Sequence, residues 1–308
     1  MRVCIVGCGA VGSLFAANLA QLEEVEVWAY DLFEEHVEAI NRAGLRLSGA
    51  GEVLGRLTAT SDAAALPACD FGIVATKAMH TAAAVEATAA AFTGGCVATV
   101  QNGLGNEEAI AEHAERVIRG TTFPAGKLLE PGHVQWDVKG DTTLGPFEQR
   151  PAPFSEVERL AEACTRGGMP TTAVRDARGP QWRKVIFNAA TNPVGALTRL
   201  THGRVCEDPE LRRLVTGLVD EGKAVAAAQG IELDADPEDL IDHAAKREVA
   251  YDHKASMLQD VEAQRPTEID YLNGGIVRFG GEHGVPTPLN RAIWALVKGL
   301  ERSWVQTQ

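Results

Sequence analysis

The first residues of the chain whose types and spacing could do chemistry are three glycines near its start, at positions 7, 9 and 12. A turn with this Gly-x-Gly-x-x-Gly spacing can hold a pyrophosphate, because each glycine serves a separate need. The first permits a tight turn, the second lets the backbone approach the phosphates, and the third lets the next helix pack closely on a sheet. The N–H groups that begin that helix would bind phosphate oxygens. The residues of this motif are Gly7, Cys8, Gly9, Ala10, Val11 and Gly12.

An acidic residue follows at the distance that dinucleotide binding requires. The apolar run 3–6 predicts a strand before the glycines, and the run 25–30 predicts a second strand that ends at Asp31. A carboxylate there accepts hydrogen bonds from the ribose 2′-OH and repels a 2′-phosphate. No lysine or arginine follows within ten positions. The pattern therefore predicts a dinucleotide site that favours NAD(H), with NADP(H) left open, and it is compatible with Asp31 also capping the next helix.

Two more polar side chains follow predicted strands. Lys77 comes after the apolar run 70–76, and Asn102 comes shortly after the run 96–100. Ligands of open parallel sheets bind outside the carboxyl ends of the strands. We therefore expect Gly9, Lys77 and Asn102 to converge on one rim beside the cofactor. Taken singly, a surface lysine and an Asn-Gly turn would also explain the two residues.

A polar stripe interrupts an apolar stretch in the second half of the chain. Lys184, Asn188 and Asn192 are spaced by four residues, which places them on one face of a helix. Asparagine has poor helix propensity, so two of them in line with a lysine indicate a face that hydrogen-bonds a ligand. A solvated face is the alternative, and the apolar residues between them leave little else that must face water.

The elements that must position these residues follow from hydrophobic periodicity. In the first half, apolar strands alternate with helices, which predicts a parallel sheet covered on both faces. The run 134–144, broken at Lys139-Gly140, predicts an antiparallel hairpin late in this half. The helices predicted here are Ser13–Leu22, Glu34–Arg42, Ala82–Phe92 and Glu107–His113.

From Trp182 onward, the pattern is almost entirely helical. The helices predicted here are Gln181–Asn192, Glu210–Gln229, Pro237–Tyr251, Thr267–Gly280 and Asn290–Trp304. Thr267 and Asp270 have capping-box spacing, so the residues alone explain Glu268 as a first-turn acid that stabilises the helix dipole. The predicted fold class is an α/β N-terminal dinucleotide-binding (Rossmann-like) domain, residues 1–177, followed by an all-α C-terminal domain, residues 178–308.

Composition narrows the function classes. The chain has 308 residues and a net charge of -13, which disfavours a nucleic-acid surface or an anionic membrane as partner. Its six cysteines form no Cys-x-x-Cys pair, which predicts buried thiols, no metal and a cytoplasmic location. Glycines interrupt the apolar start, so we do not interpret it as a signal peptide, and no apolar run is long enough to span a membrane.

The chain resembles the ketopantoate reductase (2-dehydropantoate 2-reductase) family along nearly its whole length. The matching segments, in order, are Gly7–Gly12, Thr76-Lys77-Ala, Gln101-Asn102-Gly, Gly120-Thr-Thr, Trp182 to Pro193, Ser256-Met-Leu-Gln-Asp, Thr267-Glu268-Ile-Asp270-Tyr and Val285-Pro-Thr-Pro288. The resemblance implies a dinucleotide-binding N-terminal domain, an all-helical C-terminal domain and hydride transfer between a nicotinamide cofactor and a branched 2-oxo acid, converting ketopantoate to pantoate.

The resemblance also implies roles for single residues. Lys184 matches the catalytic lysine, a general acid that protonates the keto oxygen, and Glu268 matches a glutamate that supports the site. Lys77 matches a cleft lysine near the nicotinamide. The positions that match cofactor- or substrate-binding residues are Asn102, Asn188, Asn192 and Ser256.

Two departures from the family pattern keep alternatives open. Asp31 stands where NADPH-using members commonly have a basic residue, which favours NADH. Phe123-Pro124 follows Gly120-Thr-Thr where the family often continues with threonine and histidine. An NAD-dependent D-2-hydroxyacid dehydrogenase of the same family, acting on another bulky or aromatic 2-oxo acid, therefore remains an alternative. An NAD-binding redox sensor without turnover is a further alternative, and a homodimer formed through the C-terminal helices is left open.

Overall fold

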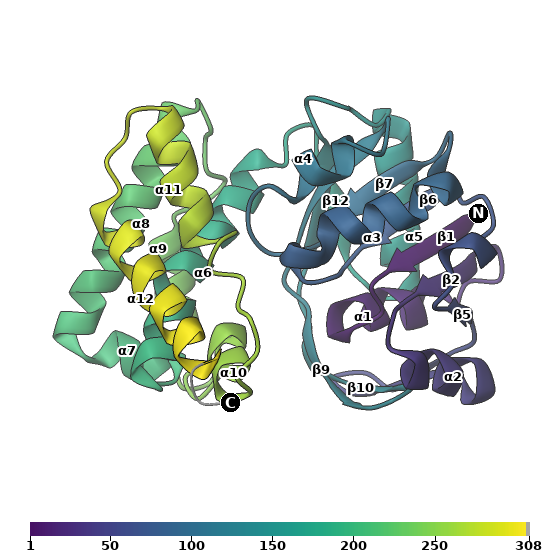
Figure 1. The fold of residues 1–308 in the computed structure, drawn as a ribbon, viewed down its shortest axis with the longest axis horizontal. Coiled ribbons are helices and arrows are strands. Elements are labelled where there is room, and N and C mark those ends of the chain that lie inside the picture. Colours follow the sequence, from purple (N-terminus) through teal and green to yellow (C-terminus); the bar gives the residue numbers. More distant parts are fainter. Residues whose placement is uncertain (306–308) are drawn as a thin grey trace. The chain divides into compact units, whose positions relative to one another are not determined.

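The computed structural model describes residues 1–305, which form two compact units. The sheet unit comprises Met1–Gln101 and Asn106–Ala177, and the helical unit comprises Asn102–Gly105 and the chain from Arg178 onward. In Figure 1 the sheet unit runs from purple to teal and the helical unit is mostly green to yellow. The expected fold class, an α/β dinucleotide-binding half followed by a helical half, is confirmed.

The sheet unit is built on an eight-stranded sheet with the order β12-β11-β8-β7-β6-β1-β2-β5. Every neighbouring pair is parallel except β11 with β8. The chain leaves β1 for β2 on one side and later returns to β6 on the other, so the strand order reverses at β1. Ligands of doubly wound sheets bind at this switch point. The strands are β1 (Arg2–Val6), β2 (Glu26–Tyr30), β5 (Thr58–Thr60), β6 (Phe71–Val74), β7 (Cys96–Thr99), β8 (Val117–Thr122), β11 (Thr142–Pro146) and β12 (Thr171–Ala173).

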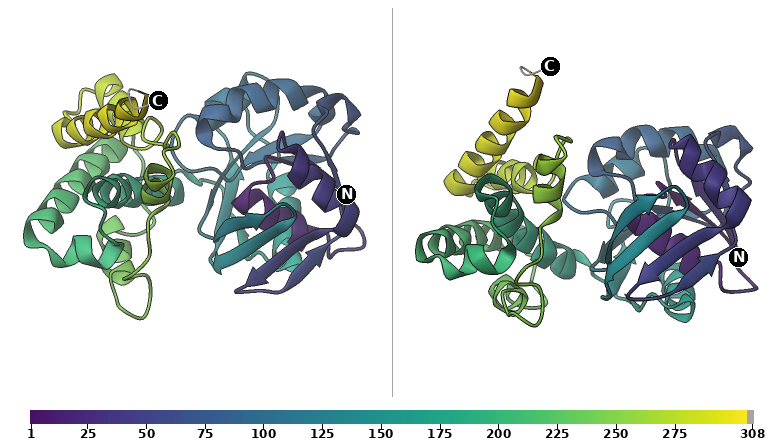
Figure 2. Two further views of the ribbon diagram at one scale, coloured as in Figure 1. Left: turned by 60° about the horizontal axis from the view of Figure 1, so that its bottom comes forward. Right: turned by 90° about the horizontal axis from the view of Figure 1, so that it is seen from below.

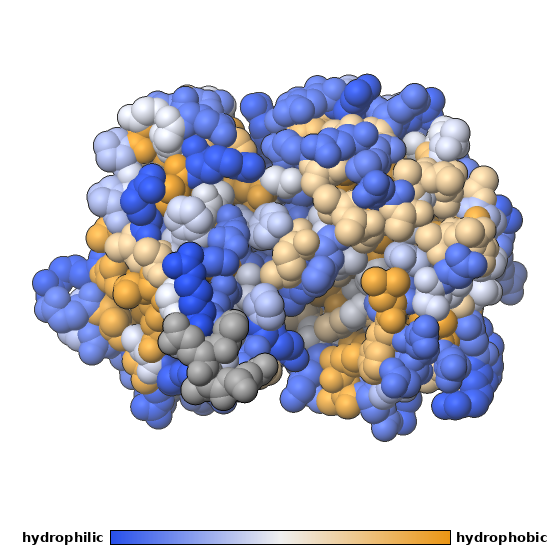
Figure 3. Space-filling model, viewed as in Figure 1, coloured by the Kyte–Doolittle hydropathy of each residue, from blue (hydrophilic) through white to orange (hydrophobic). Residues whose placement is uncertain are grey.

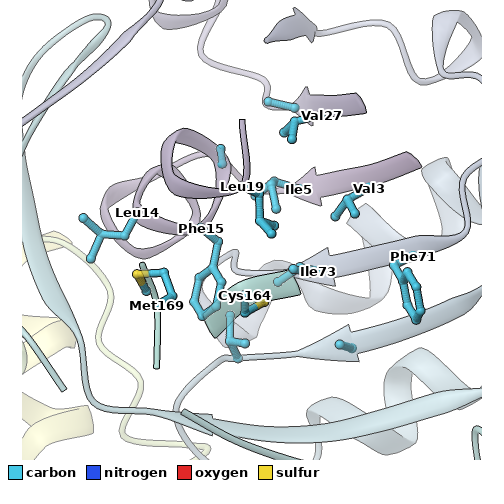
Figure 4. Close-up of a cluster of buried hydrophobic side chains, with 14 of the residues drawn as sticks. Val3, Ile5, Leu14, Phe15, Leu19, Val27, Phe71, Ile73, Cys164 and Met169 are labelled. Carbon is cyan, nitrogen blue, oxygen red and sulfur yellow. The ribbon is translucent and has the colours of Figure 1, made fainter. Parts of the chain in front are cut away.

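Apolar side chains from strands and helices fill the space beside this sheet. Figure 4 shows Val3 and Ile5 of β1 in one buried cluster with Leu14 and Phe15 of α1. Because β1 is buried on both faces, its sequence is a continuous apolar run rather than an alternating one. The helices of the sheet unit are α1 (Ala10–Leu19), α2 (Glu34–Ala43), α3 (Thr81–Thr88), α4 (Asn106–Ala111) and α5 (Phe154–Gly167), with short 3₁₀ turns at Ala63–Ala65, Ala78–His80 and Ala89–Phe92.

A second, four-stranded sheet with the order β4-β3-β10-β9 was not foreseen from the sequence. Figure 2 shows its purple and teal strands. The predicted hairpin over 134–144 is wrong, because its two strands lie in different sheets. β10 instead pairs with β9 across the tight turn at Gly132, where φ is +79°, and β11 pairs with β8. The strands of the second sheet are β3 (Leu45–Gly49), β4 (Val53–Gly55), β9 (Ala125–Glu130) and β10 (His133–Val138).

The helical unit packs its helices around α6, which spans Arg178–Thr198 and carries the predicted polar stripe. α6 is longer than the predicted Gln181–Asn192 and continues past Pro193. The other helices of this unit are α7 (His202–Glu207), α8 (Pro209–Ala228), α9 (Pro237–Ala244), α10 (Ser256–Glu262), α11 (Asn273–Glu282) and α12 (Pro288–Val305).

Pro193 is tolerated inside α6 because another helix replaces the hydrogen bond that it removes. Proline has no N–H, so the carbonyl four residues earlier, that of Ala189, loses its helical donor. Nδ2 of Asn273, which is fully buried, donates to that carbonyl at 2.9 Å and to Oδ1 of Asn290 at 3.0 Å. Asn290 in turn donates to Glu221, whose carboxylate also accepts the N–H of Asn290. This polar network ties together α6, α8, α11 and α12.

Replacing Asn273 by alanine is expected to lower the free energy of unfolding by about 2–4 kcal/mol, because two buried acceptors lose their donor. Chemical denaturation measures the change. The double variant Asn273→Ala/Pro193→Ala supplies the control, since alanine at 193 restores the helical donor to the Ala189 carbonyl. The double variant should lose less free energy of unfolding than the sum of the losses in the two single variants. Simple additivity would contradict the proposed exchange of donors.

Two helices in this unit begin or end where the sequence did not predict. α9 ends at Ala244 rather than Tyr251, and turns follow it. Residues 268–272 form a bend and turns, and α11 begins only at Asn273. The capping box predicted for Thr267 and Asp270 does not form, because both side chains are bound to α12. Trp294 Nε1 donates to Asp270 at 2.7 Å, and Lys298 Nζ donates to it at 2.8 Å.

Candidate active site

The glycine-rich turn lies at the carboxyl end of β1, where the strand order reverses. Gly7 has a φ of +89°, and a Cβ there would lie 2.6–2.9 Å from atoms of Thr76, which follows β6. Its N–H donates to the carbonyl of Tyr30 at the end of β2 (2.8 Å). Glycine is therefore required at this position both by its left-handed conformation and by the close approach of the next strand.

The other two glycines of the turn meet different needs: Gly12 is required by packing inside the protein, and Gly9 leaves space for a ligand. A Cβ on Gly12 would lie 2.0 Å from the carbonyl oxygen of Gly7, so α1 can leave the turn only with glycine there. Gly9 is the N-cap of α1 at a φ of -68°, and a Cβ on it would meet nothing within 4 Å. Ala10 and Val11 follow in the first turn of α1. The open space at Gly9, beside the N–H groups that begin a ten-residue helix, fits a pyrophosphate.

Asp31 lies at the end of β2, and its carboxylate orients the glycine-rich turn. Oδ2 accepts the N–H of Cys8 at 2.7 Å, and Oδ1 accepts the N–H of Phe33 at 2.9 Å. Each carboxylate oxygen has a second lone pair, so the group can still accept hydrogen bonds from ribose hydroxyls. The acid thus holds the glycine-rich turn in place and keeps lone pairs that a ligand could use.

Lys77 is exposed and follows β6 directly after Thr76. The loop that carries it is held by Gln101, a residue of the Gln101-Asn102-Gly motif to which the sequence assigned no role. Gln101 Nε2 lies 2.9 Å from the carbonyl of Thr76 and 2.7 Å from the hydroxyl of Thr81. Its carbonyl oxygen accepts from Thr99. In the sequence, the available signal was only its position at the end of a predicted strand, directly before Asn102.

The helical unit brings together three of the predicted residues, Asn102, Lys184 and Glu268. Lys184 Nζ donates to Oδ1 of Asn102 at 2.7 Å. Burial lowers the pKa of Lys184 from 10.5 to about 8, and the negative charge of Glu268 partly opposes this shift. A lysine with a pKa near neutral pH can donate a proton to a reacting group and be reprotonated between turnovers.

Asn188 and Asn192 continue the polar face of α6. Both side chains are 7% exposed. Oδ1 of Asn192 lies 3.4 Å from the hydroxyl of Thr191. Within the part of the chain that the structure describes, the amide of Asn188 forms no hydrogen bond. The Asn188 amide lies one helical turn after Lys184 on the same face of α6, and its role in binding a ligand stays a prediction.

Glu268 lies in the turn before α11 and is 7% exposed. The turn is held in place by Glu301 of α12, which accepts the N–H of Thr267 at 2.8 Å and its hydroxyl at 2.7 Å. Glu268 therefore sits on a braced turn rather than in the first turn of a helix. Ser256 is the first residue of α10 in the same unit, and its side chain is exposed.

Asn102 belongs to the helical unit, whereas Gly9 and Lys77 belong to the sheet unit. That Gly9, Lys77 and Asn102 line one rim beside the cofactor stays a prediction. The roles given to the candidate site residues stay predictions as well.

No cluster of three or more histidine, cysteine, aspartate or glutamate side chains that could hold a metal ion occurs within residues 1–305. In that same range, no helix has the length and apolar character needed to cross a membrane. The face shown in Figure 3 mixes hydrophilic residues with smaller groups of apolar ones.

Comparison with known families agrees with both halves of the fold. Residues 3–149 match the family profile described as ketopantoate reductase PanE/ApbA. Residues 176–301 match the profile described as the C terminal part of ketopantoate reductase PanE/ApbA. The chain therefore belongs to the ketopantoate reductase family, a family of oxidoreductases, as the sequence motifs indicated.

Individual relatives match over nearly the full length. The chain is 34% identical to a 2-dehydropantoate 2-reductase of Pyrococcus horikoshii, with 98% of each chain covered. It is 35% identical to a 2-dehydropantoate 2-reductase of Archaeoglobus fulgidus, with 97% of this chain and 98% of that one covered.

Solved structures of other proteins are similar to the structure of this chain over nearly its full length. A crystal structure of a PanE/ApbA family ketopantoate reductase from Ralstonia eutropha has a TM-score of 0.87 at 31% identity. A ternary structure of D-mandelate dehydrogenase with NADH and anilino(oxo)acetate has a TM-score of 0.89 at 28% identity. Each comparison covers 98% of this chain and 99% of the other.

Proposed function

We propose that the protein is a 2-oxo acid reductase that converts ketopantoate to pantoate, with NADH as the favoured hydride donor. The observation that carries the proposal is the environment of Lys184. Its ammonium group is partly buried, donates to Asn102 and lies near Glu268, and its pKa is lowered to about 8. Full-length relatives that carry the name 2-dehydropantoate 2-reductase support the choice of substrate.

The cofactor, when bound, supplies a hydride to the keto carbon of the substrate. The glycine-rich turn and the N-terminus of α1 would hold the pyrophosphate, and Asp31 would accept hydrogen bonds from a ribose. A 2′-phosphate would meet the negative charge of Asp31, with Glu34 and Glu35 close behind it in sequence. This electrostatic repulsion supports NADH over NADPH.

The residues of the helical unit would act on the substrate. Negative charge develops on the keto oxygen as the keto carbon is reduced, and the Lys184 ammonium would stabilise that charge and donate its proton. Asn102 holds the Nζ of Lys184 in place, and Glu268 helps to keep the lysine protonated. The amides of Asn188 and Asn192 and the hydroxyl of Ser256 would bind the carboxylate and hydroxyl of the substrate.

A second candidate substrate is a bulkier or aromatic 2-oxo acid, reduced to a D-2-hydroxy acid. The structural similarity to a D-mandelate dehydrogenase that binds NADH favours it, as does Phe123-Pro124 in place of the family's threonine and histidine. The chemistry assigned to Lys184 is the same for either acid, so the two candidates differ only in the pocket that receives the side chain of the substrate.

Steady-state turnover with two cofactors and two acids tests the proposal. We expect kcat/KM with NADH to exceed that with NADPH by at least about tenfold, since the repelled 2′-phosphate costs binding energy. We also expect ketopantoate to be reduced more efficiently than phenylglyoxylate. Absorbance loss of the reduced cofactor measures both ratios.

The possible outcomes separate the parts of the proposal. A preference for NADPH would contradict the role given to Asp31, and a preference for phenylglyoxylate would favour the second substrate. Tight NADH binding without turnover of any 2-oxo acid would contradict the enzymatic function and favour the redox sensor.

A further inference from the structure

The path of the segment 102–105 through the helical unit depends on one glycine. Gly103 has a φ of +89°, and a Cβ there would lie 2.6 Å from Cβ of Tyr271 and 2.8 Å from the carbonyl oxygen of Tyr271. No side-chain rotation relieves contacts this close to another backbone. Glycine is therefore required at position 103 both by the left-handed conformation and by the close approach of Tyr271.

Backbone and side-chain contacts fasten the same segment to the residues around the start of α11. The N–H of Leu104 donates to the carbonyl of Tyr271 at 2.8 Å, and the N–H of Tyr271 donates to the carbonyl of Glu268 at 3.0 Å. The Leu104 side chain belongs to the apolar core of the unit, and a Cβ on Gly275 of α11 would lie 3.2 Å from it. The segment is thus held on the turn that carries Glu268.

Asn102, the residue before this glycine, touches the proposed proton donor. Its Oδ1 accepts from Nζ of Lys184 at 2.7 Å. An asparagine side chain is short, so the position of Oδ1 follows the backbone at residue 102. A hydrogen bond of this length is lost once its two atoms move apart by about 1 Å. A small displacement of the segment would therefore separate Asn102 from Lys184.

We propose that Gly103 is a positioning residue for the proton donor: because it has no side chain, the segment 102–105 lies against Tyr271, and this contact keeps Oδ1 of Asn102 at Nζ of Lys184. The proposal rests on the general-acid role proposed above for Lys184, and it adds a residue that acts only through its backbone. All of these residues belong to the helical unit.

The contact has a consequence for the protonation of Lys184. Oδ1 of Asn102 accepts from the charged form of the lysine and so favours it. The negative charge of Glu268 acts in the same direction, whereas burial acts against it. Loss of the Asn102 contact should therefore lower the pKa of Lys184 below about 8 and move the fall of kcat/KM to lower pH.

Two glycines of the segment provide matched variants. Gly105 also has a positive φ, +102°, but a Cβ there would lie 3.2 Å from Nη2 of Arg278, the end of a flexible side chain. Gly103→Ala and Gly105→Ala both place alanine in the left-handed region, so both should lower the Tm. Only Gly103→Ala forces the backbone away from Tyr271.

The expected results differ between the two variants. We expect Gly103→Ala to lower kcat by about tenfold or more, because a misplaced catalytic group is costly. Its kcat/KM should fall about one pH unit earlier than that of the unmodified protein. Gly105→Ala should keep kcat within roughly twofold, with the fall of kcat/KM at its original pH.

Two further variants test the route through Asn102. Asn102→Ala removes the acceptor itself and should move the pH profile as Gly103→Ala does. The double variant Asn102→Ala/Gly103→Ala should have the kcat and pH profile of Asn102→Ala, since no acceptor is left to position. Leu104→Ala loosens the segment without a backbone clash. It should move the profile in the same direction by a smaller amount, including where Gly103→Ala does not fold.

Three results would overturn the inference. An unchanged pH profile in Gly103→Ala, or in Leu104→Ala if the former does not fold, would show that the segment does not hold Asn102. Equal shifts in Gly103→Ala and Gly105→Ala would show general loosening instead of a specific contact with Tyr271. A double variant with a lower kcat than Asn102→Ala would show that Gly103 acts by another route.

A measurement without turnover separates this inference from the proposed function. NMR titration of the ¹³C-labelled Cε of Lys184, assigned by its loss in Lys184→Met, follows the protonation of the lysine directly. An earlier titration in Gly103→Ala than in the unmodified protein supports the positioning role. If that shift is seen in a protein that reduces no 2-oxo acid, the proposed function fails and the contact stands. If the two proteins titrate alike, the inference fails whatever the activity.

Discussion

Replacing Lys184 by methionine is expected to lower kcat by about 10²–10⁴-fold, the usual contribution of a general acid. Methionine has a similar length but cannot donate a proton or stabilise negative charge on the keto oxygen. Binding of NADH should be unchanged, because the glycine-rich turn and Asp31, proposed to hold the pyrophosphate and the ribose, lie in the sheet unit, whereas Lys184 lies in the helical unit. Single-turnover kinetics and NADH titration measure the two effects.

The same substitution is expected to raise the free energy of unfolding. The pKa of Lys184 is lowered from 10.5 to about 8 in the folded protein, so the folded state disfavours the charged form. At pH 7 this costs up to about 3 kcal/mol, a cost that fades as the pH rises from 8 through 10.5. Methionine removes the charge, although it also removes the donor to Asn102. We expect a net gain of about 1–3 kcal/mol at pH 7.

Two comparisons make this prediction specific. For the unmodified protein, kcat/KM for reduction should fall as the pH rises through about 8, as the acid loses its proton. Lys223→Met is the matched control, because Lys223 lies on α8 of the same unit but is paired with Asp236 at the surface. It should keep full kcat and gain no stability. A Lys184→Met variant with near-normal turnover would contradict the assigned role.

Replacing Gly12 by alanine is expected to abolish measurable NADH binding and to lower the free energy of unfolding by about 1–3 kcal/mol or more. A Cβ at this position would lie 2.0 Å from the Gly7 carbonyl oxygen. Backbone cannot give way as a flexible side chain can, so the turn must open. Chemical denaturation and titration with NADH measure the two losses.

Gly9→Ala supplies the matched variant, because a Cβ there meets no protein atom within 4 Å. The free energy of unfolding should change by less than about 1 kcal/mol. The Kd for NADH should nevertheless rise by about tenfold or more, since the methyl group would occupy space that a pyrophosphate needs. Unchanged NADH affinity in Gly9→Ala would show that no phosphate lies against this turn.

Local patterns in the sequence were enough to predict the elements around the glycine-rich turn. The strand before Gly7, the helix after Gly12 and the strand that ends at Asp31 depend on contacts between near neighbours and on apolar runs. The periodicity of Lys184, Asn188 and Asn192 likewise predicted their common helix, α6. Each feature could be found because its signal lies within about 20 consecutive residues.

Features that depend on distant partners could not be found in this way. α6 continues past Pro193 because Asn273, far along the chain, supplies the missing donor. Glu268 lies in a turn rather than a helix because side chains of α12 bind its neighbours Thr267 and Asp270. The contact of α2 with the turn at Gly132 has no local signal either, since His36, whose Nδ1 accepts the Gly132 N–H, is 96 positions away.

The strand pairing near residue 140 failed for the same reason. Consecutive strands form hairpins so often that β10 and β11 were expected to pair with each other. Each pairs instead with another strand, β9 or β8. Alternation along the sequence predicts that a segment is a strand but does not identify its neighbour in a sheet.

The segment 102–105 limits how the gene for this protein can be divided. These four residues lie between β7 and α4 in the sequence, yet they belong to the helical unit, where Leu104 is part of the apolar core. A fragment cut to begin at Arg178 would have a hole in place of the Leu104 side chain and no partner for Lys184 at Asn102. Domain exchange between relatives must therefore move this short internal segment together with the C-terminal half, as two separate insertions.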